Sequence, residues 1–298
     1  MNLLLTGANG FVGKNLKSYL TGLCNTEELT RADLNDLKFS SIKNSTNVVH
    51  LAGLAHDLKN TNQVEAYYHV NFELTKKLYD AFLTSNASKF IFISSVKAAA
   101  DTVESVLSED VFPDPLTHYG KSKLKAEQYI QSQPLPVGKS YYILRPCMIH
   151  GPSNKGNLNL LYQLVRKGLP YPLASFENKR SFLSIENLCY VIKELMVQTD
   201  VPSGIYHISD DEPLSTNDVV KIFSMSLKRK PVLWHINKSF IYFIAKIGDQ
   251  LKLSLNSEKL NKLTENYIVS NEKIKGALNI KLPIEAKEGL MITAASFK

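Results

Sequence analysis

Three glycines at three-residue intervals, directly after a short apolar run, constrain the fold of this chain more than any other feature. The run Leu3–Leu5 ends at Thr6 and Gly7. An apolar run that stops at a glycine is typical of a buried strand in a parallel sheet. From Gly10 onward the apolar residues recur with a helical period, at Phe11, Val12, Leu16, Tyr19 and Leu20. The stretch therefore predicts a strand, a tight turn and a helix, in that order.

A dinucleotide site needs this order of elements. Gly7 would permit the turn off the strand, Gly10 would let a pyrophosphate approach the backbone, and Gly13 would let the helix pack closely. The start of the helix offers unpaired N–H groups and a positive dipole end to phosphates. The alternative is a glycine-rich loop in another kind of α/β protein. We expect a Rossmann-type, doubly wound parallel sheet that binds NAD or NADP through Gly7, Asn9, Gly10, Phe11, Val12 and Gly13.

An acid and an arginine follow the predicted second strand, residues 28–30. In dinucleotide folds an acid here bonds the adenosine ribose, and an arginine accommodates a 2′-phosphate. Asp33 and Arg31 supply both types. We predict that Arg31, Asp33 and Leu34 contact the cofactor, which leaves NAD and NADP both open; Arg31 as a plain surface residue is the alternative.

Three further segments read as strands of the same sheet: residues 47–53, 89–95 and 141–146. Ligands of open α/β sheets bind beyond the carboxyl ends of the strands. We therefore expect small or polar residues at those ends to meet the cofactor, although serines also end strands as turn formers. A buried amide in the predicted helix 61–85 needs a polar partner and is included with them. The predicted set is Leu51, Ala52, Gly53, Asn71, Ser94 and Pro146.

Tyr119 and Lys123 stand four residues apart in a predicted helix, so their side chains lie on one face. Such a pair is common by chance. It gains meaning because a strand ending in Ser94 and Ser95 precedes it in a chain that opens with a dinucleotide loop.

Composition bounds the class of protein. The 298 residues are 44% hydrophobic and 21% charged, which allows a large core. Three scattered cysteines argue against disulfides or a zinc site, so we predict no metal and a reducing, cytoplasmic location. No apolar run reaches the roughly 20 residues of a membrane span. The net charge of +7 comes from lysines that thicken toward the C-terminus. We interpret them as a solvated face and expect no nucleic-acid partner; an acidic ligand or an anionic surface is the alternative.

The loop after the predicted strand 141–146 marks a change of domain. We expect an NAD(P)-binding domain over residues 1–152, with a returning segment near 186–208. A smaller C-terminal substrate-binding domain would take residues 153–185 and 209–298.

These motifs together resemble the extended short-chain dehydrogenase/reductases, in particular the nucleotide-sugar epimerase/dehydratase family. Residues 6–13 are similar to its cofactor loop, Leu51-Ala52-Gly53 to its strand-end motif and residues 119–123 to its Y-x-x-x-K motif. The resemblance implies catalytic roles for Tyr119, Lys123 and Ser95, with Tyr119 and Lys123 also contacting the cofactor. It implies that Lys97, Asn157 and Arg180 bind the nucleotide sugar, and that the chain forms a homodimer through helices near 61–85 and 116–132.

The resemblance also suggests a mechanism. A free tyrosine has a pKa of about 10, and a nearby ammonium and the nicotinamide cation favour its phenolate. Tyr119 could then exchange a proton with the sugar while a hydride moves to or from the cofactor. Arg180 could clamp a phosphate bidentately, although it could instead form a surface salt bridge.

One departure narrows the expected reaction. Sugar dehydratases of the family carry an acid just after the catalytic Ser/Thr, where this chain has Val96-Lys97. The segment 94–97 resembles instead enzymes of surface-polysaccharide synthesis that act at C4 of UDP-linked acetamido sugars, as 4-ketoreductases or 4-epimerases. We expect that function, with UDP preferred over dTDP. The alternative is a non-catalytic NAD(P)-binding redox sensor or scaffold.

Overall fold

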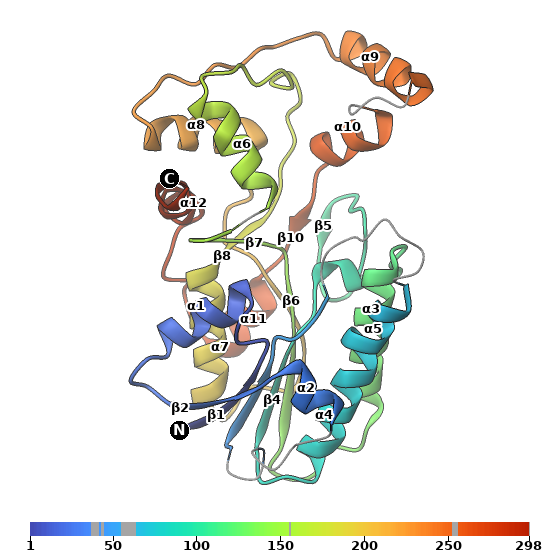
Figure 1. Ribbon diagram of the computed structural model, residues 1–298, viewed down its shortest axis with the longest axis vertical. Coiled ribbons are helices and arrows are strands. Elements are labelled where there is room, and N and C mark those ends of the chain that lie inside the picture. Colours follow the sequence, from blue (N-terminus) through green and yellow to red (C-terminus); the bar gives the residue numbers. More distant parts are fainter. Residues whose placement is uncertain (37–41, 43–44, 55–63, 155, 252–255, 298) are drawn as a thin grey trace.

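A six-stranded parallel sheet organises the lower half of the molecule (Figure 1). The computed structural model describes residues 1–36, 42, 45–54, 64–154, 156–251 and 256–297. The strands lie in the order β2-β1-β3-β4-β6-β9. Their bounds are β1 Asn2–Thr6, β2 Asn25–Leu29, β3 Asn47–His50, β4 Lys89–Ile93, β6 Ser140–Pro146 and β9 Gly204–Ile208. The order reverses between β1 and β3, which is where open α/β sheets bind their ligands.

Helices cover both faces of this sheet (Figure 1). One face carries α1 (Phe11–Tyr19), α7 (Ile185–Val197) and α11 (Glu272–Leu278). The other carries α2 (Arg31–Asn35), α3 (Val64–Tyr68), α4 (Leu74–Leu83) and α5 (His118–Ser132). The central strands are buried on both faces, as their apolar sequences require. The predicted doubly wound Rossmann-type fold is therefore confirmed.

Two local expectations differ from the structure. The second strand begins at Asn25 rather than at Glu28. Its first residues are polar and mostly exposed, so they lack the apolar run that marks a buried strand. The helix expected over residues 61–85 is interrupted by a π-helical turn, η3, at His69–Glu73. Residues 61–63 lie outside the described part of the chain. The π turn contains the buried Asn71, and such turns are frequent at functional sites.

The upper half of the molecule has its own apolar core (Figure 1). It is built from α6 (Asn157–Arg166), α8 (Thr216–Ser226), α9 (Lys238–Leu251), α10 (Ser257–Thr264) and α12 (Ala286–Ser296). The segment from Tyr267 to Leu278 packs instead against the core of the sheet half. The chain thus crosses between the halves several times. Two short strand pairs lie at the crossing: β7 (Met148–His150) with β8 (Phe182–Ser184), and β5 (Val106–Leu107) with β10 (Ile268–Val269).

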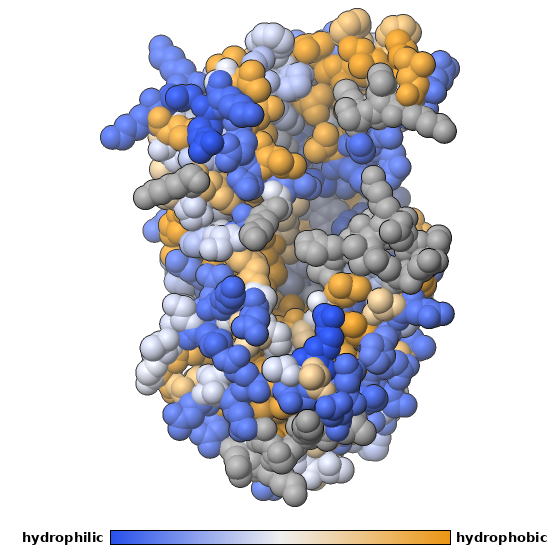
Figure 2. All heavy atoms as spheres, in the orientation of Figure 1, coloured by the Kyte–Doolittle hydropathy of each residue, from blue (hydrophilic) through white to orange (hydrophobic). Residues whose placement is uncertain are grey.

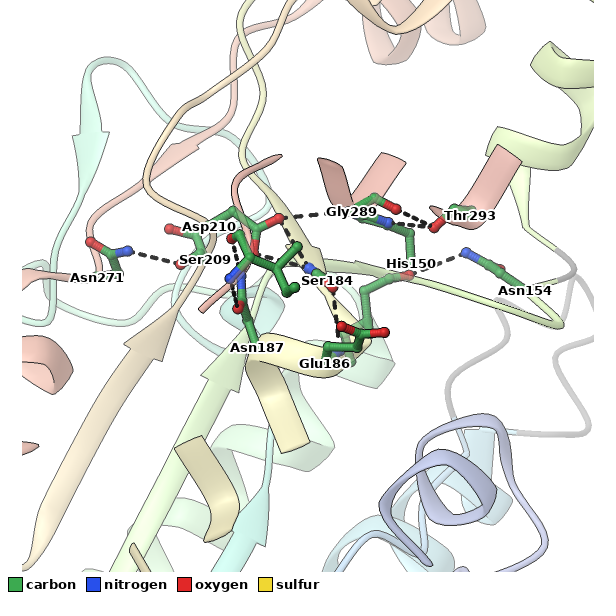
Figure 3. Close-up of polar contacts among 12 residues, drawn as sticks. His150, Asn154, Ser184, Glu186, Asn187, Ser209, Asp210, Asn271, Gly289 and Thr293 are labelled. Atoms are coloured by element: carbon green, nitrogen blue, oxygen red, sulfur yellow. Dashed lines mark hydrogen bonds and ion pairs between the residues drawn. The ribbon is translucent and has the colours of Figure 1, made fainter. Parts of the chain in front are cut away.

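A buried polar network holds this crossing together (Figure 3). The Asp210 carboxylate accepts hydrogen bonds from the backbone N–H of Ser184, at 3.0 Å, and from Asn187 Nδ2, at 2.7 Å. His150 Nδ1 lies 2.9 Å from the Thr293 hydroxyl on α12. These contacts fix β7 and β8 relative to α7 and α12. Within the described residues, no helix is long and apolar enough to cross a membrane.

Candidate active site

The glycine turn after β1 is tighter than any other residue type allows. Gly7 has φ +71°, and a Cβ there would lie 2.7 Å from the backbone N of Ala52. A Cβ on Gly13 would lie 2.3 Å from the carbonyl oxygen of Gly7. Gly10 is the N-cap of α1 and offers no side chain to fill that position. The start of α1 is therefore an open helix N-terminus of the kind that binds phosphates.

Buried hydrogen bonds fix the strand ends beside this turn. The Thr6 hydroxyl lies 2.6 Å from His50 Nδ1 and accepts the N–H of Ala52 at 3.1 Å. His50 Nε2 lies 2.9 Å from the Thr75 hydroxyl, which donates to the carbonyl of Asn71. Burial, reinforced by the charge of Lys123, lowers the pKa of His50 to about 3, so the ring is neutral. The chain of bonds holds the ends of β1 and β3 in register.

A cavity of about 220 Å³ opens at the carboxyl ends of the strands. It lies where the surface is hollowed in the middle of the molecule (Figure 2). Eight of the predicted site residues line it: Val12, Leu51, Gly53, Ser94, Ser95, Tyr119, Lys123 and Pro146. The predicted catalytic side chains therefore share one cavity. Four further residues line the cavity without having been predicted from the sequence: Leu54, Ile93, Cys147 and Ile149.

Tyr119 and Ser95 form the polar centre of the cavity. Burial raises the pKa of Tyr119, and a hydrogen bond with Ser95 partly offsets the effect. The sequence-based expectation of a lowered pKa concerned the cofactor-bound site, where the Lys123 ammonium and the nicotinamide cation together favour the phenolate. In the protein alone, burial is the largest cause of the shift, and the Lys123 ammonium donates to the carbonyl of Ile93 at 2.9 Å. In the protein alone, Tyr119 is therefore a protonated phenol at neutral pH.

Lys123 is buried next to this pair. Burial lowers the pKa of its ammonium to about 8, against the opposing effect of the Glu127 carboxylate. The ammonium lies 4.7 Å from the ring centre of Phe92. A Cβ on Gly53 would come within 2.9 Å of Lys123 Nζ, so glycine at this position leaves room for the amine.

An ion pair that the sequence analysis missed lies beneath the cavity. Arg145 and Glu127 are both fully buried and joined by several hydrogen bonds. The Ser94 hydroxyl also donates to Glu127, so this serine is held from below. Glu127 lies four residues after Lys123 on the same face of α5, and that spacing is the signal that could have revealed it.

Asn71 joins the π-helical turn to the loop after β3 and to α5. Its side-chain oxygen accepts the N–H of Leu54 at 2.8 Å, and its amide donates to the Ser122 hydroxyl at 3.0 Å. The buried amide expected to need partners has them. Its atoms bond protein groups around the cavity, so it positions the wall of the site.

The residues after β2 divide between surface and core. Arg31 is exposed at the start of α2. The Asp33 carboxylate completes a capping box, in which it accepts the N–H and the hydroxyl of Thr30. The side chain of Leu34 is buried in the core. Arg31 is exposed, Asp33 is half-buried and Leu34 is buried, and the carboxylate expected to bond a ribose caps a helix in the protein alone.

Two of the three predicted substrate residues, Lys97 and Arg180, already have partners within the protein. Lys97 donates to the carbonyl of Asp101 at 2.8 Å and lies 4.3 Å from the ring centre of Tyr267. Arg180 forms an ion pair with Glu265 at 2.9 Å, so the structure realises the salt bridge that was the alternative to a phosphate clamp. Asn157 is exposed at the first position of α6. Glu265 and Arg180 both act on the pKa of Lys97, in opposite directions, so the Arg180–Glu265 ion pair lies near Lys97.

The site fits a dinucleotide on two observations. The glycine turn leaves no room for any Cβ where a pyrophosphate would approach, and the adjoining cavity ends at a buried Tyr–Ser–Lys group. Residues 7–13 would hold the phosphates, and the cavity would take the reactive ring.

Comparison with known proteins identifies the family. The model of the NAD dependent epimerase/dehydratase family matches residues 3–209. The chain is 30% identical to the UDP-glucose 4-epimerase of Vibrio cholerae, over 99% of this chain and 95% of that protein. It is 26% identical to the N-acetyl-alpha-D-glucosaminyl-diphospho-ditrans,octacis-undecaprenol 4-epimerase of Escherichia coli O157:H7, over 92% of this chain and 84% of that protein.

Solved structures agree on the fold. The UDP-N-acetylglucosamine 4-epimerase from Bacillus cereus superposes with a TM-score of 0.78 at 18% identity, covering 100% of this chain and 99% of that one. A complex of MoeE5 with UDP-glucose and NAD gives a TM-score of 0.76 at 20% identity, over 99% and 98% of the two chains. The predicted family and the predicted use of a nicotinamide cofactor are confirmed: the chain belongs to the NAD-dependent epimerase/dehydratase family of enzymes.

Proposed function

We propose that this enzyme is a 4-epimerase of a UDP-linked sugar, with an acetamido sugar as its preferred substrate. The observation that carries the proposal is the meeting of Tyr119, Ser95 and Lys123 at one cavity beside the glycine turn. The relatives from V. cholerae and E. coli are both named as 4-epimerases, which favours epimerisation over ketoreduction. Val96 and Lys97 stand where the dehydratases of the family carry an acid, which argues against loss of water.

Each polar residue of the cavity has a role that its chemistry allows. Residues 7–13 and the cavity would hold the dinucleotide, which would supply the acceptor and the donor of a hydride at C4 of the sugar. Tyr119 first releases its own proton to solvent; the phenolate then takes the proton of the C4 hydroxyl and later gives it back to the same oxygen. Ser95 hydrogen-bonds that oxygen and keeps it in line with Tyr119. Lys123, with a pKa of about 8, carries a positive charge at neutral pH that favours the phenolate when Tyr119 releases its proton.

The diphosphate would lie against the cations of the upper half. The side chains of Arg180 and Glu265 are 21% and 25% exposed. Because both reach solvent, Glu265 can turn away and leave Arg180 free to bind a phosphate. The open N-terminus of α6 at Asn157 adds backbone donors on the same side. These groups recognise a diphosphate and leave the identity of the sugar to the cavity wall.

A second substrate is favoured by one specific relative. The E. coli protein is named for a sugar diphosphate carried on undecaprenol. This substrate and a UDP-sugar share the sugar diphosphate, so the groups named above would serve either one. Assays with both carriers separate the two.

A sugar labelled at C4 tests the proposal. UDP-N-acetylglucosamine with deuterium at C4 is incubated with the wild-type enzyme, and the product is followed by NMR and mass spectrometry. We expect inversion at C4 with the deuterium retained and without consumption of added cofactor. Loss of the label into added NAD or NADP would indicate an oxidoreductase without epimerisation. Absence of any product across a panel of UDP-, dTDP- and lipid-linked sugars would refute the assignment.

A further inference from the structure

Helix α9 has two apolar faces, and the upper core uses only one of them. Ile241, Ala245 and Gly248 are buried against that core. A second set of apolar residues recurs at the spacing of a helix face, which places it on a separate stripe about a quarter turn away. The stripe consists of Phe240, Phe243, Ile244, Ile247 and Leu251.

This stripe faces solvent. Phe240 is 55% exposed, Phe243 60% and Leu251 65%. Ile244 is exposed as well, and Ile247 is half-buried. The helix lies at the upper edge of the molecule, away from the sheet, and apolar residues gather at this end of the surface (Figures 1 and 2). Contiguous apolar surface of this kind marks a site of association, since a scattered exposed residue needs no explanation but an ordered stripe does.

The net charge of the segment that carries the stripe indicates what covers it. From Lys228 to Glu265 the chain carries eight Lys and Arg residues against three Asp and Glu, a net charge of +5. The whole chain has a net charge of +7. Most of the excess positive charge therefore lies within 38 of 298 residues, on the segment that contains α9. Lys238 and Lys246 lie on α9 itself, and both are exposed.

Two kinds of partner could cover an apolar helix face, and the charge favours one of them. A second copy of this chain would bring another segment of net charge +5 against the first, which is unfavourable. An anionic bilayer attracts the lysines and accepts the phenylalanines and leucine at the same time. A basic helix with aromatic and aliphatic residues along one side is the pattern of helices that lie in a membrane interface.

We propose that the enzyme docks on an anionic lipid surface through α9, with the stripe Phe240–Leu251 in the interface and the net positive charge of residues 228–265 attracted to the lipid head groups. The inference does not depend on the reaction, because the stripe is separate from the residues that line the cavity. The sequence analysis left two readings of the lysines near the C-terminus, a solvated face or contact with an anionic surface. The proposal favours the anionic surface.

A single tryptophan makes the proposal measurable. Trp234 is the only tryptophan of the chain, is 55% exposed, and lies in the extended segment that leads into α9. The full-length protein is mixed with vesicles of phosphatidylcholine alone, or of the same lipid with about 30% phosphatidylglycerol. We expect co-sedimentation and a blue shift of tryptophan emission with the anionic vesicles, both reduced by salt because the head-group attraction is screened.

Matched variants distinguish vesicle binding through the stripe from nonspecific binding through any exposed apolar residue. Phe240→Ser/Phe243→Ser should lower the vesicle partition coefficient by about tenfold or more, because two large apolar side chains are lost from the interface. Lys238→Gln/Lys246→Gln should lower only the preference for anionic vesicles. Leu23→Ser/Val137→Ser removes two exposed apolar residues from loops before β2 and β6, and should bind as the wild type does. Circular dichroism verifies that each variant is folded.

Three outcomes would overturn the proposal. The first is absence of binding to anionic vesicles by the wild type. The second is equal binding by the phenylalanine variant and the wild type. The third is a dimer in sedimentation equilibrium that Phe240→Ser/Phe243→Ser converts to a monomer while vesicles leave the wild type unaffected, since a second copy would then cover the stripe. C4 epimerisation of a water-soluble UDP-sugar is assayed separately, so failure of the two proposals is distinguishable.

Discussion

Replacing Lys123 with methionine should raise the stability of the folded chain at neutral pH while it removes activity. The ammonium of Lys123 is buried and has a pKa of about 8, against an ordinary value of 10.5. The difference corresponds to about 3 kcal/mol. Because the folded state disfavours the proton, this amount is missing from the free energy of unfolding below pH 8 and is regained between pH 8 and pH 10.5.

Lys123→Met lacks this pH dependence of the free energy of unfolding, so the difference between the wild type and the variant isolates the contribution of Lys123. Methionine keeps the length of the side chain but leaves the Ile93 carbonyl without the 2.9 Å hydrogen bond from Lys123, at a cost of about 1–3 kcal/mol. At pH 7 the two effects oppose each other, so we expect Lys123→Met to be between equal to the wild type and about 2 kcal/mol more stable. From pH 7 to pH 10 the wild type should gain about 2–3 kcal/mol relative to the variant.

Urea unfolding at several pH values measures both quantities. Other lysines and tyrosines titrate in the same range, but they are present in both proteins and cancel in the difference. Repeating the pair in a Tyr119→Phe background removes any change in the titration of Tyr119. A difference in the free energy of unfolding that stays constant from pH 7 to pH 10 would refute the buried, easily deprotonated amine.

Two further predictions concern binding. Gly13→Ala should abolish NAD binding measured by calorimetry, because the added Cβ would lie 2.3 Å from the Gly7 carbonyl oxygen. The control Gly276→Ala adds its Cβ in open space on α11, so it should bind NAD normally and gain about 0.5–1 kcal/mol of stability. NAD binding by Gly13→Ala equal to that of the control would contradict the role of the turn. Arg180→Ala should weaken UDP binding about tenfold or more, while Glu265→Gln, which frees Arg180 from its 2.9 Å ion pair, should strengthen it by up to about fivefold. Unchanged affinity in both variants would remove Arg180 from the substrate site.

The fold could be predicted largely because its signals are local. Gly7, Gly10 and Gly13 lie where close contacts within one turn leave little or no room for a Cβ. The buried strands are marked by runs of apolar residues in the sequence. The second strand was placed too late because Asn25 to Glu28 are polar or exposed, and only its pairing with β1 makes it a strand.

The site could be predicted as a set of residues but not in its interactions. Tyr119, Ser95 and Lys123 were found from spacing, and the cavity brings them together. The spacing of Tyr119 and Lys123 did not show how strongly burial raises the pKa of Tyr119 in the protein alone. The partners of Arg180 and Arg145 lie 85 and 18 residues away, at Glu265 and Glu127, and no periodicity links such pairs. The sequence also showed Phe240 to Ala245 only as an apolar run too short to span a membrane, and its exposure on α9 appears only in three dimensions.

The measurement that tests the central claim most directly is a comparison of Tyr119→Phe with the wild type on the same UDP-sugar. The account makes the Tyr119 hydroxyl the group that carries the proton to and from the C4 oxygen. Losing it should lower kcat by about 10² to 10⁴, while the calorimetric affinities for NAD and for UDP stay within about twofold, since the ring remains to fill the cavity. A variant that turns over at the wild-type rate would contradict the account.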